Sequence, residues 1–237
     1  MLKSRTIVVT GASKGIGAAI AENLHDIHGF DVVGLSRTGE VPAGRGLECD
    51  MTDHNAVKHA LAIAAGSHGL AGIVNNAGLY IGCASAELTL ETYQQVMNLN
   101  ATAVMVASRE AYPHFKTNGG GRIVNIGSFF DKMGVPDNLP YCASKAAVAA
   151  MTRCLAVEWA ADNITTVNVA PGYIETDLNR DWLSRDKVRH WLQSRIPVGN
   201  PGRPEDVAKL VGALMAEDIP FLTGETIYLD GGQGMNH

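Results

Sequence analysis

The feature that most constrains this chain is a short β-branched run that passes through a glycine-rich turn into a helix. The run Thr6–Thr10 has no polar alternation, which is typical of a strand buried on both faces of a parallel sheet. The turn Gly11–Gly17 follows it and opens a predicted helix over 16–25. Glycines let the backbone approach a pyrophosphate, and a helix N-terminus supplies free N–H groups with partial positive charge. The junction therefore predicts a dinucleotide site, although a plain tight turn is compatible with it too.

Strand and helix patterns alternate along the rest of the chain. We expect strands over 6–10, 31–35, 46–49, 72–76, 121–126, 164–169 and 225–229, and helices over 16–25, 55–65, 91–115, 141–160 and 204–216. This alternation predicts the α/β class, with a single doubly wound, Rossmann-like parallel sheet and helices on both faces. No linker, repeat or low-complexity tract divides residues 1–237, so we expect one domain.

Composition and charge exclude several classes of protein. Charged residues make up 18% of the chain and hydrophobic residues 46%, which favours a globular fold over disorder. The net charge is −5 and no basic run is present, so nucleic acid is not an expected partner. No apolar stretch is long enough to span a membrane, and the run before Gly11 is too short for a signal peptide.

The cysteines indicate the compartment. Cys49, Cys83, Cys142 and Cys154 form no C-x-x-C pair and no Cys/His cluster with zinc spacing. We therefore expect no metal site and four free thiols in a reducing environment, which predicts a cytoplasmic protein.

The spacing of the glycine turn, G-x-x-x-G-x-G, narrows its chemistry. It departs from the commoner G-x-G-x-x-G fingerprint, and it lacks the G-K-[ST] ending of a P-loop, which argues against nucleotide hydrolysis. Dinucleotides bind at the first strand–helix junction of doubly wound sheets, where this turn lies. The residues expected to contact the cofactor here are Gly11, Ser13, Lys14, Gly15, Ile16 and Gly17.

The end of the second strand indicates which dinucleotide binds. An acidic residue there would bind the adenosine ribose and favour NAD, but the strand tip holds Ser36 and Arg37, and Asp31 comes too early. Arg37 can form charge-assisted hydrogen bonds to a 2′-phosphate, and Lys14 can add a second cation. We therefore predict NADP(H), with NAD(H) as the alternative if both cations are merely solvated.

Tyr141 and Lys145 are the candidate pair for proton transfer. They are four residues apart in a predicted helix, so their side chains lie on one face. A free tyrosine has a pKa of about 10, and a nearby ammonium favours the phenolate and lowers that pKa. The pair alone is a weak signal, because the same spacing occurs by chance on many helices.

Two polar residues strengthen this interpretation. Ser128 follows the fifth predicted strand, where its hydroxyl could bind a substrate carbonyl oxygen, although it could equally be a turn residue. Asn100 lies inside the predicted helix 91–115, and asparagine has low helix propensity. Its alternative role is a buried polar group that the backbone or water satisfies.

Taken together, these residues resemble the short-chain dehydrogenase/reductase family, and within it members similar to 3-oxoacyl-carrier-protein reductases. The resemblance runs from about Ser4 to Gly232. The motifs that carry it are Thr10–Gly17, Asp50, Asn75–Gly78, Asn98–Asn100, Ser128, Tyr141–Lys145 and Pro171-Gly172.

The resemblance implies a role for each catalytic side chain. Tyr141 would be the acid/base, and Lys145 would hold the nicotinamide ribose and lower the tyrosine pKa. Ser128 would polarise the carbonyl, and Asn100 would bind a water that links Lys145 to solvent. Cys142 departs from the serine of many relatives but leaves the Tyr–Lys spacing intact.

The resemblance also implies further cofactor contacts and an assembly. Asp50 and the Met51 backbone would contact adenine, and the segment Asn76, Ala77 and Gly78 would line the cofactor. Pro171, Gly172 and Thr176 would flank the nicotinamide. A homotetramer would form through the long helices and the C-terminal strands.

Apolar residues near these motifs could form a substrate pocket, although ordinary packing explains each of them as well. They are Leu79, Tyr80, Phe129, Phe130, Met133, Val135 and Tyr173. By resemblance, a substrate lid would cover about 174–200 and include Trp182 and Trp191. We expect a small or medium-sized carbonyl or secondary alcohol as substrate, without a signal for its identity.

The predicted function is therefore an NADP(H)-dependent oxidoreductase that transfers a hydride to or from a carbonyl or alcohol carbon. The close alternative is an NAD-dependent alcohol dehydrogenase on the same scaffold. A lyase of the halohydrin dehalogenase type would replace Lys145 and degrade the glycine turn, and neither change is present. A non-catalytic dinucleotide-binding module would have no chemical need for all four catalytic side chains.

Overall fold

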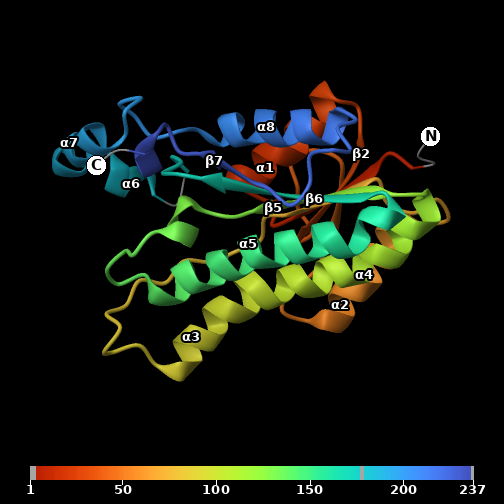
Figure 1. Ribbon diagram of the computed structural model, residues 1–237, viewed down its shortest axis with the longest axis horizontal. Helices are drawn as coiled ribbons and strands as arrows, with labels where there is room; N and C mark the ends of the chain where they lie inside the picture. The colour runs from red at the N-terminus through yellow and green to blue at the C-terminus, as the bar shows by residue number, and fades with distance from the viewer. Residues whose placement is uncertain (1–3, 177–178, 236–237) are drawn as a thin grey trace.

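A parallel sheet forms the centre of the computed structural model, which describes residues 4–176 and 179–235 (Figure 1). Its strands in these ranges are β1 (Thr6–Thr10), β2 (Asp31–Ser36), β3 (Arg45–Glu48), β4 (Gly72–Asn75), β5 (Gly121–Ile126), β6 (Ile164–Pro171) and β7 (Thr226–Leu229). Their order is β3-β2-β1-β4-β5-β6-β7, and all neighbours pair in parallel. The predicted doubly wound α/β fold is confirmed, with its switch point between β1 and β4.

Helices cover both faces of this sheet. They are α1 (Gly15–Glu22), α2 (His54–Ala65), α3 (Leu90–Met97), α4 (Ala103–Asn118), α5 (Leu139–Trp159), α6 (Arg180–Leu183), α7 (Asp186–Arg195) and α8 (Pro204–Ala216). In Figure 1, α1 and α8 lie above the sheet, and α2, α4 and α5 lie below it. No helix in the described part of the chain has the length and hydropathy needed to cross a membrane.

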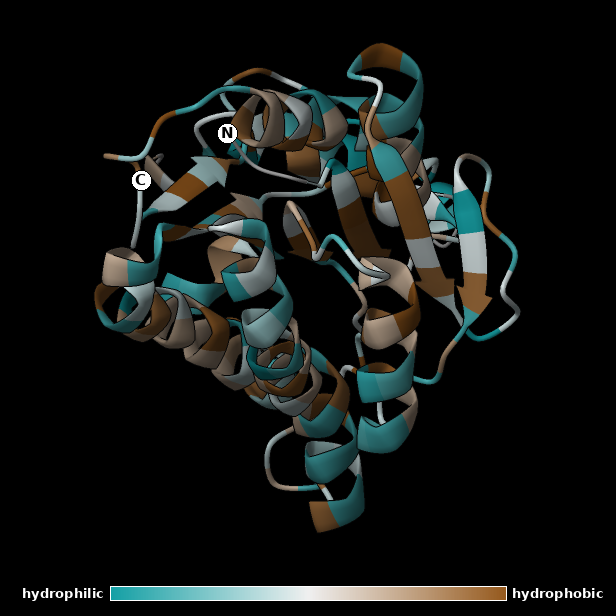
Figure 2. Ribbon diagram, turned by 90° about the vertical axis from the view of Figure 1, so that its right-hand side faces the viewer, coloured by the Kyte–Doolittle hydropathy of each residue, from teal (hydrophilic) through white to brown (hydrophobic). Residues whose placement is uncertain are grey.

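The core explains why the first strand shows no polar alternation. Ile7 and Val9 belong to one apolar cluster, which includes residues of α1 and α8. Val8 belongs to the other cluster, which includes residues of α2 and α4. Both faces of the strand are therefore buried, and hydropathy colouring shows the central strands as largely hydrophobic (Figure 2).

The helix expected over 91–115 is present over residues 90–118, but it is not α-helical throughout. Between α3 and α4 the chain forms a π-helical turn at Asn98–Thr102. Turns of this kind insert a residue into a helix and often occur at functional sites. The inserted turn contains Asn100, whose side chain is completely buried.

Local capping defines several helix boundaries. The Asp53 carboxylate accepts hydrogen bonds from the backbone N–H groups of Asn55 (2.9 Å) and Ala56 (3.1 Å), so this residue caps the start of α2. Pro140 and Pro204 lie in the first turns of α5 and α8, where a missing N–H costs little. Helices α6 and α7 lie in the segment expected to form the lid, and residues 177 and 178 of that segment are outside the described residues.

Candidate active site

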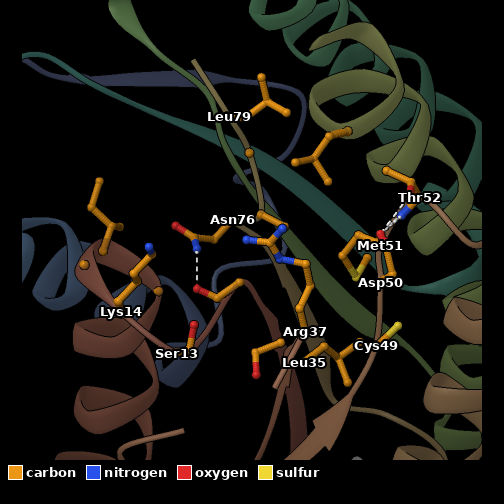
Figure 3. Close-up of a pocket in the computed structure, with 18 of the residues that line it drawn as sticks. Ser13, Lys14, Leu35, Arg37, Cys49, Asp50, Met51, Thr52, Asn76 and Leu79 are labelled. Atoms are coloured by element: carbon orange, nitrogen blue, oxygen red, sulfur yellow. Dashed lines mark hydrogen bonds between the residues drawn. The ribbon is translucent and has the colours of Figure 1, made fainter. Parts of the chain in front are cut away.

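A cavity of about 590 Å³ opens at the carboxyl ends of β1, β2 and β4 (Figure 3). This is the edge of a doubly wound sheet where ligands bind. Fourteen of the predicted cofactor-binding residues line it, namely Gly11, Ser13, Lys14, Gly15, Ile16, Gly17, Ser36, Arg37, Asp50, Met51, Asn76, Ala77, Gly78 and Thr176. The structure therefore brings together residues that are up to 165 positions apart in the sequence.

The glycine turn has a backbone conformation and close backbone contacts that residues with side chains would not allow. Gly11 has a φ of +66°, in the left-handed region that favours glycine. A Cβ atom at Gly17 would overlap the carbonyl oxygen of Gly11, which belongs to the backbone and has little freedom to move. The turn can therefore hold its shape only with glycine at these positions.

Asn76 fixes this turn from the neighbouring strand. Its Nδ2 donates to the carbonyl oxygens of Thr10 (3.0 Å) and Gly11 (3.2 Å). In return, the Thr10 hydroxyl accepts from the backbone N–H groups of Asn76 and Ala77, both at 3.0 Å. The ends of β1 and β4 are thus tied together directly beside the cavity.

The first turn of α1 faces this cavity with no side-chain cap. Lys14 occupies the N-cap position, and its side chain makes no capping hydrogen bond. The first N–H groups of a helix lack partners within the helix and favour an anion. Tight backbone, open N–H groups and a cavity of this size fit the diphosphate of a dinucleotide.

Two cations accompany this N-terminus. Arg37 follows β2 and Lys14 lies in the glycine turn, and both side chains line the cavity (Figure 3). Hydrogen bonds from the Thr52 backbone and hydroxyl hold the pKa of Asp50 below its usual value, and Arg37 adds to this effect. Ser36 is buried, and its hydroxyl donates to the Glu40 carbonyl oxygen at 3.2 Å.

The predicted proton-transfer pair lies on α5. The Lys145 Nζ lies 5.7 Å from the Tyr141 ring centroid and donates to the Ile126 carbonyl oxygen at 2.8 Å. Two turns further along α5, the Thr152 hydroxyl accepts from Asn125 Nδ2 at 2.9 Å. Buried bonds to β5 therefore fix the helix that carries the pair.

Burial raises the pKa of Tyr141, and a hydrogen bond with the Ser128 side chain opposes this rise. Burial also lowers the pKa of Lys145 to about 8, which weakens its hold on a proton. The expectation that Lys145 lowers the pKa of Tyr141 stays a prediction, because desolvation is the largest influence on that pKa in this structure.

Asn100 is engaged with the backbone near the cavity. Its Oδ1 accepts from the Leu79 N–H (2.8 Å), and its Nδ2 donates to the Leu79 carbonyl (2.9 Å) and the Ser144 hydroxyl (3.2 Å). The Ser144 hydroxyl in turn donates to the Tyr141 carbonyl at 2.7 Å. Both amide hydrogens of Asn100 are occupied, so a bound water would have to donate a hydrogen bond to an oxygen of this residue.

The predicted contacts after β6 divide into two groups. Thr176 lines the cavity, where its methyl group lies beside Gly15. Pro171 ends β6, and the Gly172 N–H donates to the Leu229 carbonyl at 3.0 Å. Pro171, Gly172, Tyr141 and Lys145 are not among the residues that line the described cavity.

Sequence reasoning missed five residues of the site and placed a sixth, Leu79, in the substrate pocket. The five residues are Leu35, Cys49, Thr52, Gln95 and Leu99, and they line the cavity together with Leu79. Thr52 directly follows a predicted contact, so adjacency could have indicated it. Ser144 could have been found as a serine buried within a helix, three residues after Tyr141.

Comparisons with known proteins agree with this geometry. A family model described as enoyl-(acyl carrier protein) reductase matches residues 11–234. The chain is 36% identical to the 3-oxoacyl-[acyl-carrier-protein] reductase MabA of Mycobacterium tuberculosis over 99% of this chain and 94% of that protein.

Two solved structures are similar in fold. Aldohexose dehydrogenase (AldT) of Thermoplasma acidophilum has a TM-score of 0.90 and 29% identity, with 99% of this chain and 96% of that chain covered. A protein from Beutenbergia cavernae, provisionally described as an NAD(P)-dependent gluconate 5-dehydrogenase and solved with NADP bound at low occupancy, has a TM-score of 0.90 and 30% identity. That alignment covers 97% of this chain and 96% of the other.

Proposed function

This chain belongs to the short-chain dehydrogenase/reductase family, and we propose that it is an NADP(H)-dependent reductase of small or medium-sized carbonyl compounds. The family membership makes it an oxidoreductase that transfers a hydride between a nicotinamide dinucleotide and a substrate carbon. The cofactor preference, the roles of individual residues and the substrate class are the proposed part.

The bound dinucleotide supplies or accepts the hydride. In reduction, Tyr141 donates the proton that the carbonyl oxygen needs, and Ser128 orients that oxygen by a hydrogen bond. Lys145 holds the cofactor ribose, and Asn100 maintains the position of the segment at Leu79 and, through Ser144, of the first turn of α5. In oxidation, the same tyrosine accepts the proton.

The protonation state of Tyr141 suits the proton transfer that reduction needs. Because burial raises the pKa of its hydroxyl, the residue stays a neutral phenol at neutral pH, which is the form that donates a proton. The Ser128 hydrogen bond moderates this rise without abolishing it.

Arg37 is the observation that carries the cofactor preference. Its side chain lines the cavity at the end of β2, and among the described residues it forms no ion pair. A 2′-phosphate would find Arg37 and Lys14 as cationic partners there. The NADP-bound relative from Beutenbergia cavernae supports the same preference.

Comparing kcat/KM for NADPH and NADH tests this proposal. We expect NADPH to be preferred, and Arg37→Asp to shift the ratio toward NADH by about 10- to 100-fold, because a charge-assisted contact becomes a repulsion. Lys58→Asp, the same charge change on the exposed face of α2, should leave the ratio unchanged. Clear preference of the unaltered protein for NADH would favour the NAD-dependent alcohol dehydrogenase alternative.

We also propose a homotetramer. The exposed strand edge at β7 and the exposed Val157 on α5 support pairing through these elements. Ala146, Ala147 and Ala150, which are not fully buried within one chain, would allow close helix packing. A solution mass of four times the 25.1 kDa chain would agree with this assembly, and a mass of 25.1 kDa would contradict it.

Residues 1–237 are further proposed to form one domain that works in the cytoplasm, with a lid over about 174–200. Four free thiols support a reducing compartment. Helices α6 and α7 lie at the same end of the molecule as the first turn of α5 (Figure 1), which supports a lid near Tyr141. Protection of this segment from proteolysis by NADP⁺ with a substrate analogue would test the lid.

A further inference from the structure

Aromatic rings surround Tyr141 on the side of α6 and α7. The Tyr141 ring meets Tyr80 at 5.5 Å and Phe130 at 6.0 Å between centroids, both edge to face. We call the connected set the aromatic wall, and it consists of Tyr80, Phe129, Phe130, Tyr173, Trp182 and Trp191.

Tyr173 connects the wall to the proposed lid. Its ring lies 6.2 Å from Phe130 and contacts both lid indoles, Trp182 at 6.2 Å and Trp191 at 5.8 Å. Five separate segments of the chain therefore supply rings to one continuous surface that ends at the proton-transfer residue.

Core packing accounts for Phe129, which is 2% exposed, but not for the rings that remain exposed. The chain has five Phe, six Tyr and three Trp residues, and half of these fourteen rings belong to the wall or to Tyr141. The core is built mainly from Val, Ile, Leu and Ala. Tyr80, Trp182 and Trp191 remain 60%, 39% and 41% exposed, so much of the wall is apolar surface that a ligand could cover.

The groups that act on the pKa of Tyr141 are Ser128, Cys142 and Tyr80, none of which is charged at neutral pH. Arg195 is the charged group that acts on Tyr173, and its guanidinium lies 6.0 Å from the Trp191 ring centroid. Lys145 is already bonded to the Ile126 carbonyl. The other cations of the lid, Arg180, Arg185, Lys187 and Arg189, are exposed to solvent. We therefore expect solvent to screen their attraction for an anionic substrate that lies between the wall and Tyr141.

We propose that the substrate is an uncharged ketone, or the matching secondary alcohol, on a flat, ring-bearing apolar skeleton that packs against the aromatic wall. Aromatic faces bind flat rings by stacking and edge contacts in addition to the burial of apolar area. An open chain covers such a wall less well because it loses rotational freedom on binding. This inference rests on the proposed reductase function and specifies its substrate class.

The test measures kcat/KM with NADPH for three carbonyl compounds. These are α-tetralone, an open-chain ketone with the same number of carbon atoms, and a keto-sugar acid. We expect α-tetralone to exceed the open-chain ketone by about tenfold and the acid by about a hundredfold. Equal or better turnover of the acid or the open-chain ketone would overturn the inference while leaving the reductase function intact.

Tryptophan variants test whether the wall produces the preference for α-tetralone over the open-chain ketone. Trp191→Leu should lower kcat/KM for α-tetralone about tenfold and for the open-chain ketone less than about twofold, and Trp191→Phe should restore most of the loss. Trp159→Leu is the control, because Trp159 packs on Tyr112 at 4.9 Å, outside the wall. If Trp191→Leu does not fold, Trp182→Leu provides the same comparison. Equal losses for both ketones would contradict the inference.

Calorimetric titration of α-tetralone into Tyr141→Phe separates the inference from the proposed function. One outcome is that α-tetralone binds, that Trp191→Leu weakens this binding, and that the unaltered protein turns over no carbonyl compound. This outcome would support the substrate class and reject the reductase function. Absence of binding to a folded protein that reduces other ketones would reject the substrate class alone.

Discussion

The cofactor cavity and the aromatic wall lie at the same end of the sheet but are built by different means. The cavity depends on backbone: glycine conformations, an uncapped helix start, and the Asn76 bonds that tie β1 to β4. The wall consists of side chains, most of them partly exposed, whose ring contacts contribute about 0.5–1.5 kcal/mol each. The backbone forms the site for the dinucleotide, which the whole family shares. Side chains form the proposed site for the substrate, which varies within the family, and these side chains can be substituted without disturbing the sheet.

Gly17→Ala should disrupt the cavity and leave the wall intact. The new Cβ would overlap the Gly11 carbonyl, so the turn must shift, and a misplacement of this kind costs about 100-fold. We expect NADPH affinity to fall by that factor in a fluorescence titration, while tryptophan emission from the wall stays unchanged.

Gly134→Ala is the matched control, because a Cβ there would meet no atom within 4 Å. Its NADPH affinity should equal that of the unaltered protein. Unchanged affinity in Gly17→Ala would show that the turn does not position the cofactor.

Lys145→Met should alter how stability depends on pH. Burial lowers the pKa of Lys145 from 10.5 to about 8, so between these values the unfolded chain binds a proton that the folded protein does not. The free energy of unfolding should therefore rise with pH across this window, by up to roughly 3 kcal/mol. Below about pH 8, Lys145 is protonated in both states, and this rise with pH is absent.

Urea unfolding at several pH values checks this prediction. Lys145→Met should lack the rise, while Lys58→Met, at an exposed lysine of α2, should retain it. Identical pH dependence in all three proteins would mean that Lys145 is not desolvated.

Asp53→Ala should have the smallest effect and should touch neither region. It removes the cap of α2, which costs about 1 kcal/mol and lowers Tm by about 2–4 °C in a chain of this size. Both NADPH affinity and kcat should stay constant in parallel assays. A loss of affinity would show that the cavity depends on the stability of α2.

Local patterns predicted most of the fold and the cofactor side. The β-branched run at Thr6–Thr10 and the glycines after it act over a few residues, so their effect on the backbone can be inferred without tertiary contacts. The same holds for the Asp53 cap.

Properties that depend on distant contacts could not be predicted in this way. The π-helical turn around Asn100 has no local sequence signal and is accompanied by bonds to Leu79 and Ser144. The raised pKa of Tyr141 follows from burial by rings on other segments, which spacing alone does not reveal. The bond from the Gly172 N–H to the end of β7 likewise joins positions far apart in the sequence.

The most direct test of the central claim uses the variant Tyr141→Phe. The absorbance of NADPH is followed during a single turnover with a carbonyl substrate, and the NADPH dissociation constant is measured on the same sample. Removing the proton donor should slow the step by about 10³-fold, because general acid catalysis contributes that order of rate. The dissociation constant should stay within about twofold, since Tyr141 does not line the cavity. Turnover at the unaltered rate would contradict the assignment of Tyr141 as the proton-transfer residue.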